Sequence, residues 1–419
     1  MDRLANPIRP YAWGSATAIP HLLGVAPTGE PQAEQWMGAH PGAPSRTPRG
    51  TLTEVIDTDP EGTLGAPAVA RFGPHLPFLL KLLAAGAPVS LQVHPDLTQA
   101  REGYAREQQQ DIPLTAGHRN YKDANHKPEL ICALTPFEGL CGFRPPHATA
   151  DLLARLDVDG LKPYVDLLRA TPEDAALREV LTAILSADRT EIAALVTETA
   201  QACARLAAED PDSVEPGTTA PASDPDPADP AAAPAAARTA AYAAYAGLAH
   251  HYPGDPGVLA ATLLNHVRLQ PGEALFLGAG VPHTYLHGLG VEIMANSDNV
   301  LRCGLTPKHI DVPELLRVVR FEAADPAVLR PEASPDGEEV YDTPIDEFRL
   351  SRLTRPEDAA PGDLTTDTPQ ILLCTAGTIT LHGGGGPETL TPGTSVFVAA
   401  GDRTEVTGAG TLFRATVVV

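Results

Sequence analysis

The chain has 419 residues, and because its 53 acidic residues outnumber 30 basic ones, its formal net charge is −23. This length suits two or three domains with a sizeable core. The strong negative charge argues against nucleic acid or an anionic membrane surface as a partner. The five scattered cysteines, odd in number and without paired metal spacing, favour a reducing compartment and no disulfide framework.

The first fifty residues are rich in proline, glycine and tryptophan, which predicts short strands and loops. The chain begins without the apolar core of a signal peptide, and its best apolar run, around 76–93, is interrupted by Lys81 and too short to span a bilayer. We therefore expect a cytoplasmic protein. Trp13 is either a core side chain or a wall of a sugar pocket, since flat rings pack well on pyranose faces.

The segment S-L-Q-V-H-P-D (90–96) ends this apolar run and predicts a strand. Successive side chains of a strand point to opposite faces, so Ser90, Gln92 and His94 share one face. An amide oxygen beside an imidazole can begin a metal site, which then needs further ligands. The alternative interpretation is an ordinary strand with a hydrogen-bonded polar pair.

Two later segments supply further donors. In N-H-K-P-E-L (125–130), the proline favours an extended chain, and Lys127 and Glu129 share a face of the strand that begins there. In G-A-G-V-P-H (278–283), a Gly/Pro turn delivers His283 to the start of another strand. Together with Gln92 and His94, these residues form a set of nitrogen and oxygen ligands suited to a divalent metal.

From about residue 148 the apolar period becomes helical. The run Thr171-Pro172-Glu173-Asp174 predicts a helix start capped by the hydroxyl of Thr171. Residues 209–237, with repeated Asp-Pro and Ala-Pro steps and no aromatic residue, predict a flexible acidic loop. A helix is expected to resume near Thr239.

Strands are predicted after His266, and one internal repeat is informative. L-Q-P-G-E-A-L-F-L-G-A-G (269–280) aligns without gaps to L-T-P-G-T-S-V-F-V-A-A-G (390–401), with six identical positions. A strand-turn-strand unit ending in glycine is typical of jelly-roll barrels such as cupins. The alignment places Thr404 opposite His283, so the second unit lacks that metal donor. We expect a mainly β protein with two cupin-like jelly-roll barrels and an α-helical insertion.

The predicted domain organisation follows from these boundaries. Residues 1–147 and 251–325 would form a catalytic cupin-like domain, and residues 148–250 the helical insertion with its acidic loop. Residues 326–419 would form a structural C-terminal cupin-like domain without metal.

Several blocks resemble the type I mannose-6-phosphate isomerases, and they cover most of the chain in the family's order. The blocks are Q-V-H-P-D, N-H-K-P-E-L, V-E-I-M-A-N-S-D-N-V-L-R-C-G-L-T-P-K (291–308), P-Y-A-W-G-S (10–15) and E-Q-W-M-G-A-H-P (34–41). The resemblance implies that Gln92, His94, Glu129 and His283 bind one zinc ion per chain and that Arg302 is catalytic. It also implies interconversion of mannose 6-phosphate and fructose 6-phosphate through an enediolate, as part of mannose metabolism.

The residue that transfers the proton is left open by the sequence. Arginine is too basic to exchange protons readily, so Arg302 would orient the substrate and stabilise its oxyanion. Glu292, Asp298, His126 and Lys127 are the candidates for the base. For Glu292, the alternative role is that of a hydrogen-bonded carboxylate behind the site.

The substrate-binding residues we expect are Ser90, Trp13, Lys308 and His126. Lys308 or Lys127 would contact the phosphate or an oxygen of the sugar, and the Ser90 hydroxyl would donate to the phosphate. The expected partner is a small sugar phosphate, and we expect a monomer. Two rival functions are a metal-dependent cupin oxygenase and a sugar-binding cupin without activity. The cationic residues argue against the oxygenase, because oxygen needs no cationic pocket.

Overall fold

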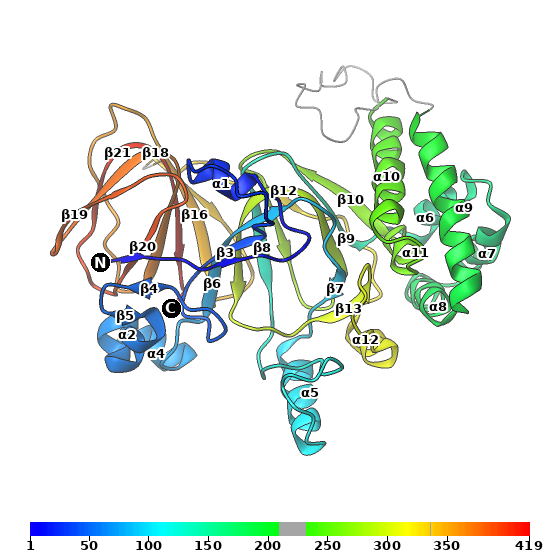
Figure 1. Cartoon of the computed structure of the whole chain (residues 1–419), viewed down its shortest axis with the longest axis horizontal. Coiled ribbons are helices and arrows are strands. Elements are labelled where there is room, and N and C mark those ends of the chain that lie inside the picture. The colour runs from blue at the N-terminus through cyan, green and yellow to red at the C-terminus, as the bar shows by residue number, and fades with distance from the viewer. Residues whose placement is uncertain (209–231, 336) are drawn as a thin grey trace.

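The computed structural model describes residues 1–208, 232–335 and 337–419. Three regions lie side by side: helices at one end, a strand-rich region in the middle, and a second strand-rich region at the other end (Figure 1). The protein is therefore rich in sheet and carries a separate group of helices, as the sequence predicts. Within the described residues, no helix is long and apolar enough to cross a membrane.

The middle region is an eleven-stranded sheet. Its strands are β2 (Ile8–Arg9), β3 (Glu34–Met37), β6 (Phe78–Ala85), β7 (Leu91–Val93), β8 (Glu129–Ala133), β9 (Phe137–Phe143), β10 (Leu264–Leu269), β11 (Ala274–Leu277), β12 (His283–Ala295), β13 (Leu301–Gly304) and β14 (Val328–Leu329). The longest strand, β12, pairs with β7 and β9 at its start and with β6 and β8 at its end. It therefore joins the strands that carry the predicted metal ligands.

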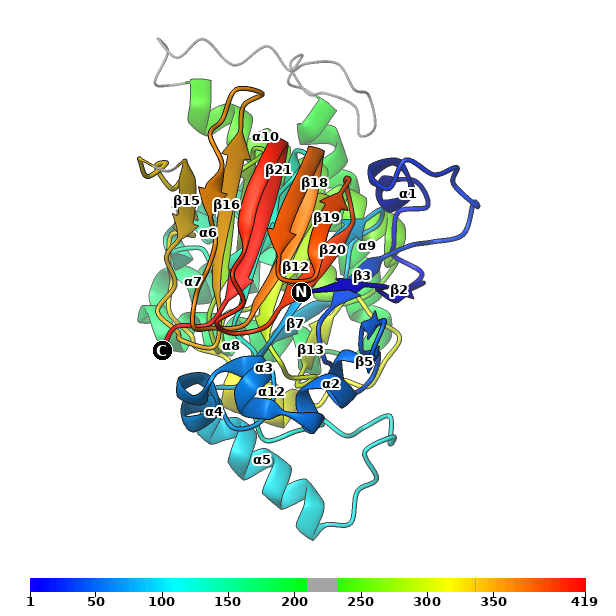
Figure 2. The ribbon, with the colours of Figure 1, turned by 90° about the vertical axis from the view of Figure 1, so that its left-hand side faces the viewer.

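The region at the far end is an eight-stranded sheet, seen face-on in Figure 2. Its strands are β1 (Asp2–Leu4), β15 (Glu338–Tyr341), β16 (Arg349–Arg355), β17 (Gly362–Asp363), β18 (Gln370–Gly383), β19 (Gly386–Leu390), β20 (Ser395–Val398) and β21 (Glu405–Thr416). The N-terminal strand β1 pairs with β20. The expected boundary, which gave residues 1–147 to the first domain, is thus wrong for β1, because its backbone hydrogen bonds are made with the C-terminal sheet.

The two sheets share an apolar core. Leu80 and Leu82 on β6 and Val291 on β12 belong to one buried cluster with Phe397 and Phe413 of the second sheet. Because side chains alternate along a strand, Lys81 and Glu292 on the same two strands point to the opposite face. Strands β6 and β12 are therefore buried on both faces, which explains why β6 reads as a nearly continuous apolar run.

Helices surround both sheets. They are α1 (Ala18–Leu22), α2 (Leu52–Thr58), α3 (Pro60–Leu64), α4 (Ala66–Phe72), α5 (Leu97–Gln109), α6 (Pro146–Ala154), the 3-10 turn η1 (Asp159–Leu161), α7 (Lys162–Ala170), α8 (Glu173–Ser186), α9 (Arg189–Ala208), α10 (Ala232–His251), α11 (Gly257–Ala261) and α12 (Val312–Val318). A short strand pair, β4 (Arg46–Thr47) and β5 (Gly50–Thr51), precedes α2. Apolar residues of α6 to α11 pack against Leu91 and Val93 of β7 and Leu301 of β13, so the helices cover the outer face of these two strands.

Two details of the predicted helices are wrong. The start of α8 is as expected, but its N-cap is Pro172 without a side-chain hydrogen bond, and Thr171 instead ends α7. Helix α10 begins at Ala232 rather than near Thr239. Alanine is the strongest helix former, and proline is tolerated in a first turn, so the Ala-rich end of the acidic segment joins the helix. The rest of the predicted loop, residues 209–231, lies outside the described residues.

Candidate active site

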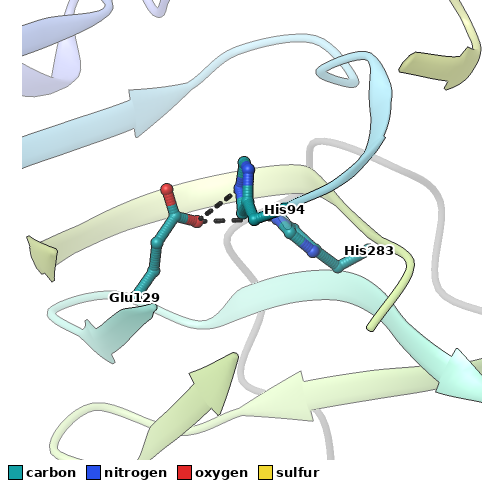
Figure 3. Close-up of side chains that lie close together, drawn as sticks. All are labelled: His94, Glu129 and His283. Carbon is teal, nitrogen blue, oxygen red and sulfur yellow. Dashed lines mark ion pairs between the residues drawn. The ribbon is translucent and has the colours of Figure 1, made fainter. Parts of the chain in front are cut away.

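Three of the four predicted metal ligands meet in one buried cluster. His94 follows β7, Glu129 begins β8 and His283 begins β12. Glu129 Oε2 lies 3.5 Å from Nε2 of both His94 and His283, and the possible ligand atoms of the three residues lie within 4.8 Å of one another. Figure 3 shows both imidazoles directed at the same carboxylate.

The hydrogen bonds made by the outer nitrogens of the two imidazoles leave the inner nitrogens facing the cluster. His94 Nδ1 lies 2.8 Å from the carbonyl oxygen of Asn299, and His283 Nδ1 lies 3.0 Å from that of Val281. A carbonyl oxygen only accepts, so each Nδ1 carries the proton and each Nε2 presents a lone pair to the cluster. His94 Nε2 and Glu129 Oε2 are buried without a hydrogen-bond partner among the described residues. Unpaired buried acceptors are costly, and a divalent cation would satisfy them.

The protonation states also suit a metal. Burial first, and then the charge of Lys127, lower the pKa of His94 to about 4, so its imidazole is neutral near neutral pH. Burial acts to raise the pKa of Glu129, but Lys127, followed by the two imidazoles, holds it well below its ordinary value. A neutral imidazole and an ionised carboxylate are the forms that bind zinc.

Gln92 completes the predicted set from the neighbouring strand. Gln92 on β7 is the cross-strand partner of His283 on β12, and its side-chain nitrogen lies 3.4 Å from His283 Nε2. The oxygen and nitrogen of an amide are assigned from their hydrogen bonds rather than seen directly. Exchanging the two atoms places the Gln92 oxygen beside the cluster, where it can serve as the fourth ligand.

Arg302 lies in the same row of the sheet as Gln92 and His283. It pairs with Gln92 across β13 and β7, and the half-buried guanidinium has an Nε without a hydrogen-bond partner among the described residues. Burial lowers the pKa of Arg302. The strand pairing therefore places this cation two strands from His283.

Two lysines extend this positive charge. Burial and then Arg302 lower the pKa of Lys308, while burial, Arg119 and Arg302 lower the pKa of Lys122. Lys122 was missed at the level of the sequence. The signal available in the sequence was that Lys122 lies in Y-K-D-A-N-H-K-P-E (121–129), the segment that ends at the predicted ligand Glu129.

Three of the four candidate bases are already paired. Lys127 Nζ lies 2.7 Å from Glu129 Oε1, and Glu292 Oε2 accepts a 2.8 Å hydrogen bond from Lys81. His126 Nε2 lies 2.6 Å from the carboxylate of Glu347, which comes from the loop before β16. Their side chains are 3 to 18% exposed, so each is held inside the protein by its partner.

Asp298 differs from these three. Its side chain is 55% exposed, and His40 Nε2 lies 3.4 Å from its carboxylate. Partial burial acts to raise the pKa of Asp298, but His40, with Lys127 and Lys81 nearby, holds it below its ordinary value. Asp298 is therefore an accessible carboxylate next to Asn299, the residue that fixes His94.

The two remaining predicted substrate residues lie in different places. Ser90 is half-buried beside β7, on the face that carries Gln92. Trp13 stacks on Tyr11 with ring centroids 5.8 Å apart and packs against the apolar cluster inside the first sheet that contains Ala85 and Phe137. Its role in substrate binding stays a prediction.

Comparison with known proteins agrees with this site. A family model described as phosphomannose isomerase type I, catalytic domain, matches residues 1–146. The mannose-6-phosphate isomerase of Escherichia coli K12 is 38% identical over 423 residues, which cover 99% of each chain. This chain belongs to the mannose-6-phosphate isomerase family. The human mannose-6-phosphate isomerase is 30% identical over 395 residues, covering 90% of this chain and 87% of the human one.

Solved structures of mannose-6-phosphate isomerases share the fold throughout. A lysine-to-alanine mutant of the phosphomannose isomerase from Salmonella typhimurium aligns over 100% of both chains, with a TM-score of 0.86 and 34% identity. A mannose 6-phosphate isomerase bound with zinc and yttrium aligns over 100% of both chains, with a TM-score of 0.83 and 35% identity. The family resemblance seen in the sequence motifs is thereby confirmed over the whole chain.

Proposed function

We propose that this protein interconverts mannose 6-phosphate and fructose 6-phosphate through an enediolate, with one zinc ion per chain held by Gln92, His94, Glu129 and His283. The observation that carries the proposal is the convergence of two inward imidazole nitrogens and a carboxylate, with Arg302 two strands from His283 and its Nε without a hydrogen-bond partner among the described residues. Bound zinc would supply a Lewis acid that stabilises negative charge on substrate oxygens without redox chemistry.

The proton transfer is assigned to Asp298. A base takes the C2 proton of the open-chain aldose, the C–H electron pair becomes the C1–C2 double bond, and negative charge collects on O1. The proton then returns to C1, while the O2 hydroxyl proton passes to O1. Asp298 is preferred over Glu292, His126 and Lys127 because its carboxylate is exposed, whereas the titratable groups of the other three each form a close ion pair inside the protein. A base must reach its proton within hydrogen-bond distance.

The basic side chains near the site are assigned to the two negatively charged parts of the substrate, the enediolate and the phosphate. Arg302 can hold the planar enediolate with two parallel hydrogen bonds. Lys308 and Lys122, both near Arg302, supply the local positive field that a phosphate needs in a protein of net charge −23. Ser90, on the face of Gln92, would donate a hydrogen bond to the same phosphate. Lys127 and Lys81 hold the carboxylates of Glu129 and Glu292 in place.

We further infer that each sheet is a cupin-like jelly-roll barrel, with the metal in the first barrel only. The support is the aligned repeat, whose two copies form β11 and β20 with their flanking turns. In this organisation the helical insertion spans the segment from α6 to α10, and β1 belongs to the second barrel. A monomeric state and a cytoplasmic location remain predictions, and light scattering of the purified protein tests the first.

Metal analysis and a coupled assay on one purified sample test the function. We expect about one zinc per chain, turnover of both sugar phosphates, and loss and recovery of turnover when zinc is removed and restored. Oxygen uptake without isomerisation would instead indicate a cupin oxygenase. Binding of the sugar phosphate without turnover by the zinc-loaded protein would indicate a binding cupin.

A further inference from the structure

A buried histidine stands behind the exposed carboxylate of Asp298. His40 follows β3 and is 4% exposed, and its Nε2 lies 3.4 Å from Asp298 Oδ1. On the other side of the ring, Nδ1 accepts a 3.0 Å hydrogen bond from the backbone N–H of Gly42. An imidazole nitrogen that accepts is unprotonated, so the neutral ring carries its proton on Nε2, directed at Asp298.

The ring of His40 is fixed by its neighbours. The indole of Trp36 packs edge-on against it, with ring centroids 4.8 Å apart and an interplanar angle of 74°. A Cβ atom at Gly42 would lie 3.2 Å from His40 Nδ1, so this close turn favours glycine. Because the turn and the indole hold two sides of the ring, rotation of His40 away from Asp298 would break both contacts.

The main chain of Asp298 is held as well. Its backbone N–H donates a 2.8 Å hydrogen bond to Asp123, and the hydroxyl of the preceding Ser297 donates to the same carboxylate at 2.8 Å. The side chain is left with His40 as its neighbour on one side and solvent on the other. A cavity of about 370 Å³, lined by His40, Asp298 and Lys122 among others, opens at this point.

We propose that His40 is a positioning residue, which aims the carboxylate of Asp298 at the substrate by donating from Nε2. The inference rests on the proposed function, in which Asp298 exchanges the proton between C2 and C1. A carboxylate that is half exposed would otherwise sample several rotamers, each misplacing the base. Outer partners that orient a functional group are commonly worth about 10- to 100-fold in activity, which sets the size of the expected effect.

Substitution of His40 tests the donor separately from the shape of the ring. His40→Phe keeps an aromatic ring against Trp36 but has no donor, and we expect kcat to fall about 10- to 100-fold with KM changed less than about threefold. His40→Gln places an amide N–H near the position of Nε2 and should recover part of the lost kcat. His75, which lines the same cavity, provides the control, and His75→Phe should leave kcat unchanged. Zinc content and melting temperature are measured on every variant.

A pH profile supplies a readout that a purely structural histidine would not move. Since His40 holds the pKa of Asp298 down, its loss should raise that pKa and shift the acidic limb of kcat/KM to higher pH. If His40→Phe unfolds, His40→Gln alone still carries the test, because an amide donor is a weaker partner and should give an intermediate kcat. A folded His40→Phe enzyme with wild-type kcat and profile would overturn the proposal. If His40→Phe does not fold, a wild-type kcat and profile in His40→Gln would overturn it.

The variant Asp298→Asn tests the assignment of Asp298 as the base separately from the positioning role of His40. If it is nearly inactive and the double variant with His40→Phe is no worse, the two residues act as one unit and the proposal stands. If Asp298→Asn is inactive but the two losses multiply, His40 acts elsewhere and the inference is wrong while the assigned base stands. If Asp298→Asn turns over normally, the base itself is misassigned, and the inference falls with it.

Discussion

The two copies of the internal repeat share the backbone conformation of their glycines and differ in the side chain that stands three residues after the repeat. Gly272 and Gly393 hold the turn with φ of 92° and 80°, and Gly280 and Gly401 end the unit with φ of 78° and 76°. Three residues after Gly280, His283 Nδ1 donates to the carbonyl oxygen of Val281 at 3.0 Å. Thr404, its counterpart, donates to the equivalent carbonyl at 3.2 Å. The same local bond thus holds an imidazole of the candidate metal cluster in the first copy and a hydroxyl in the second.

The interiors of the two sheets also differ in the charges that they bury. Inside the first sheet lie the buried charges of Lys81, Glu292, Lys127 and Glu129, each with a partner. The corresponding cluster of the second sheet is apolar, with Leu372, Val396 and Leu412 among its members. Burying charge costs free energy unless it is paired, and the first sheet maintains a set of such buried ion pairs. On the described strands of the second sheet, the buried charged side chain is Arg355, which donates to backbone carbonyls. This difference favours the first sheet as the location of the active site.

Removing the histidine of the first copy should have the largest effect. We expect His283→Ala, like His94→Ala or Glu129→Ala, to lose zinc and isomerase activity together, because only three ligands, one of them a neutral amide, are left to hold the ion. Gln92→Ala should weaken zinc binding less, since a neutral amide oxygen is the poorest ligand of the set. Metal content and turnover are measured on the same samples.

Thr404→Ala is the matched control in the second copy. It should keep zinc and activity and lose about 1 kcal/mol of stability with its buried hydrogen bond. Anomalous scattering at the zinc edge should show one strong peak per chain, next to His283. Full zinc occupancy in His283→Ala would refute the ligand assignment, and a second peak at Thr404 would refute the contrast between the copies.

Removing a buried lysine of the first sheet should cost more stability than removing a surface arginine of the second. Lys81 is buried between Glu292 at 2.8 Å and Glu34 at 3.7 Å. Lys81→Met leaves these carboxylates without their cation, and we expect a loss of about 3 to 5 kcal/mol in the free energy of unfolding. In the second sheet, Arg3 pairs with Glu388 at the surface, and Arg3→Met should cost under about 1 kcal/mol.

Urea unfolding of the two variants decides between these values. Adding Glu292→Gln to Lys81→Met should restore part of the stability by removing one unpaired charge. Equal losses for Lys81→Met and Arg3→Met would mean that the two interiors do not differ in the way their charges suggest.

Arg302 tests whether the first sheet contributes catalysis beyond metal binding. Arg302→Ala should keep its zinc and its fold and lose about a hundredfold in kcat, comparable to the loss of one oxyanion donor. Arg302→Lys should recover only part, because lysine offers one compact charge in place of a planar fork. The exposed Arg349 on β16 of the second sheet is the control. Turnover of Arg302→Ala within about threefold of wild type, under about 1 kcal/mol, would contradict the catalytic role.

The sequence predicted those parts of the site that are set by local pattern. Strand alternation placed Gln92 and His94 together, a proline fixed the start of β8 at Glu129, and a Gly/Pro turn placed His283 at the start of β12. The repeat located β11 and β20 for the same reason. Each of these features depends on a few consecutive residues, so a single sequence is enough to see it.

What the sequence did not predict depends on distant contacts. His40 meets Asp298 across 258 residues of chain, and His126 meets Glu347 across 221. No sequence periodicity or motif spacing links the members of either pair, because each contact depends on how distant parts of the chain pack together. The pairing of β1 with β20 is of the same kind. Lys81 gave one signal, as a charge inside an apolar run, but its two acidic partners come from β3 and β12 and could not be assigned without the fold.

A pH titration of stability gives the smallest expected effect. His266 on β10 has a buried Nε2 without a hydrogen-bond partner among the described residues, 3.8 Å from Glu138, with Arg268 and Arg144 also nearby. Burial first, opposed by Glu138, lowers its pKa to about 4. The unfolded chain, with a histidine pKa near 6.5, therefore binds the proton more readily than the native protein.

The sign follows from proton linkage. A histidine whose native pKa is depressed contributes stability that is present above about pH 6.5 and is lost as the pH falls toward about 4. Between about pH 7 and pH 5 this loss is about 2 kcal/mol for His266. In His266→Gln the same fall in pH should therefore cost about 2 kcal/mol less than in the wild type, measured by urea unfolding at each pH. His382 of the second sheet is exposed and its imidazole contacts the hydroxyl of Thr407, so His382→Gln should follow the wild-type curve. If both variants follow it, burial of His266 is not a source of acid sensitivity, and the difference between the two sheets is confined to the residues around the metal.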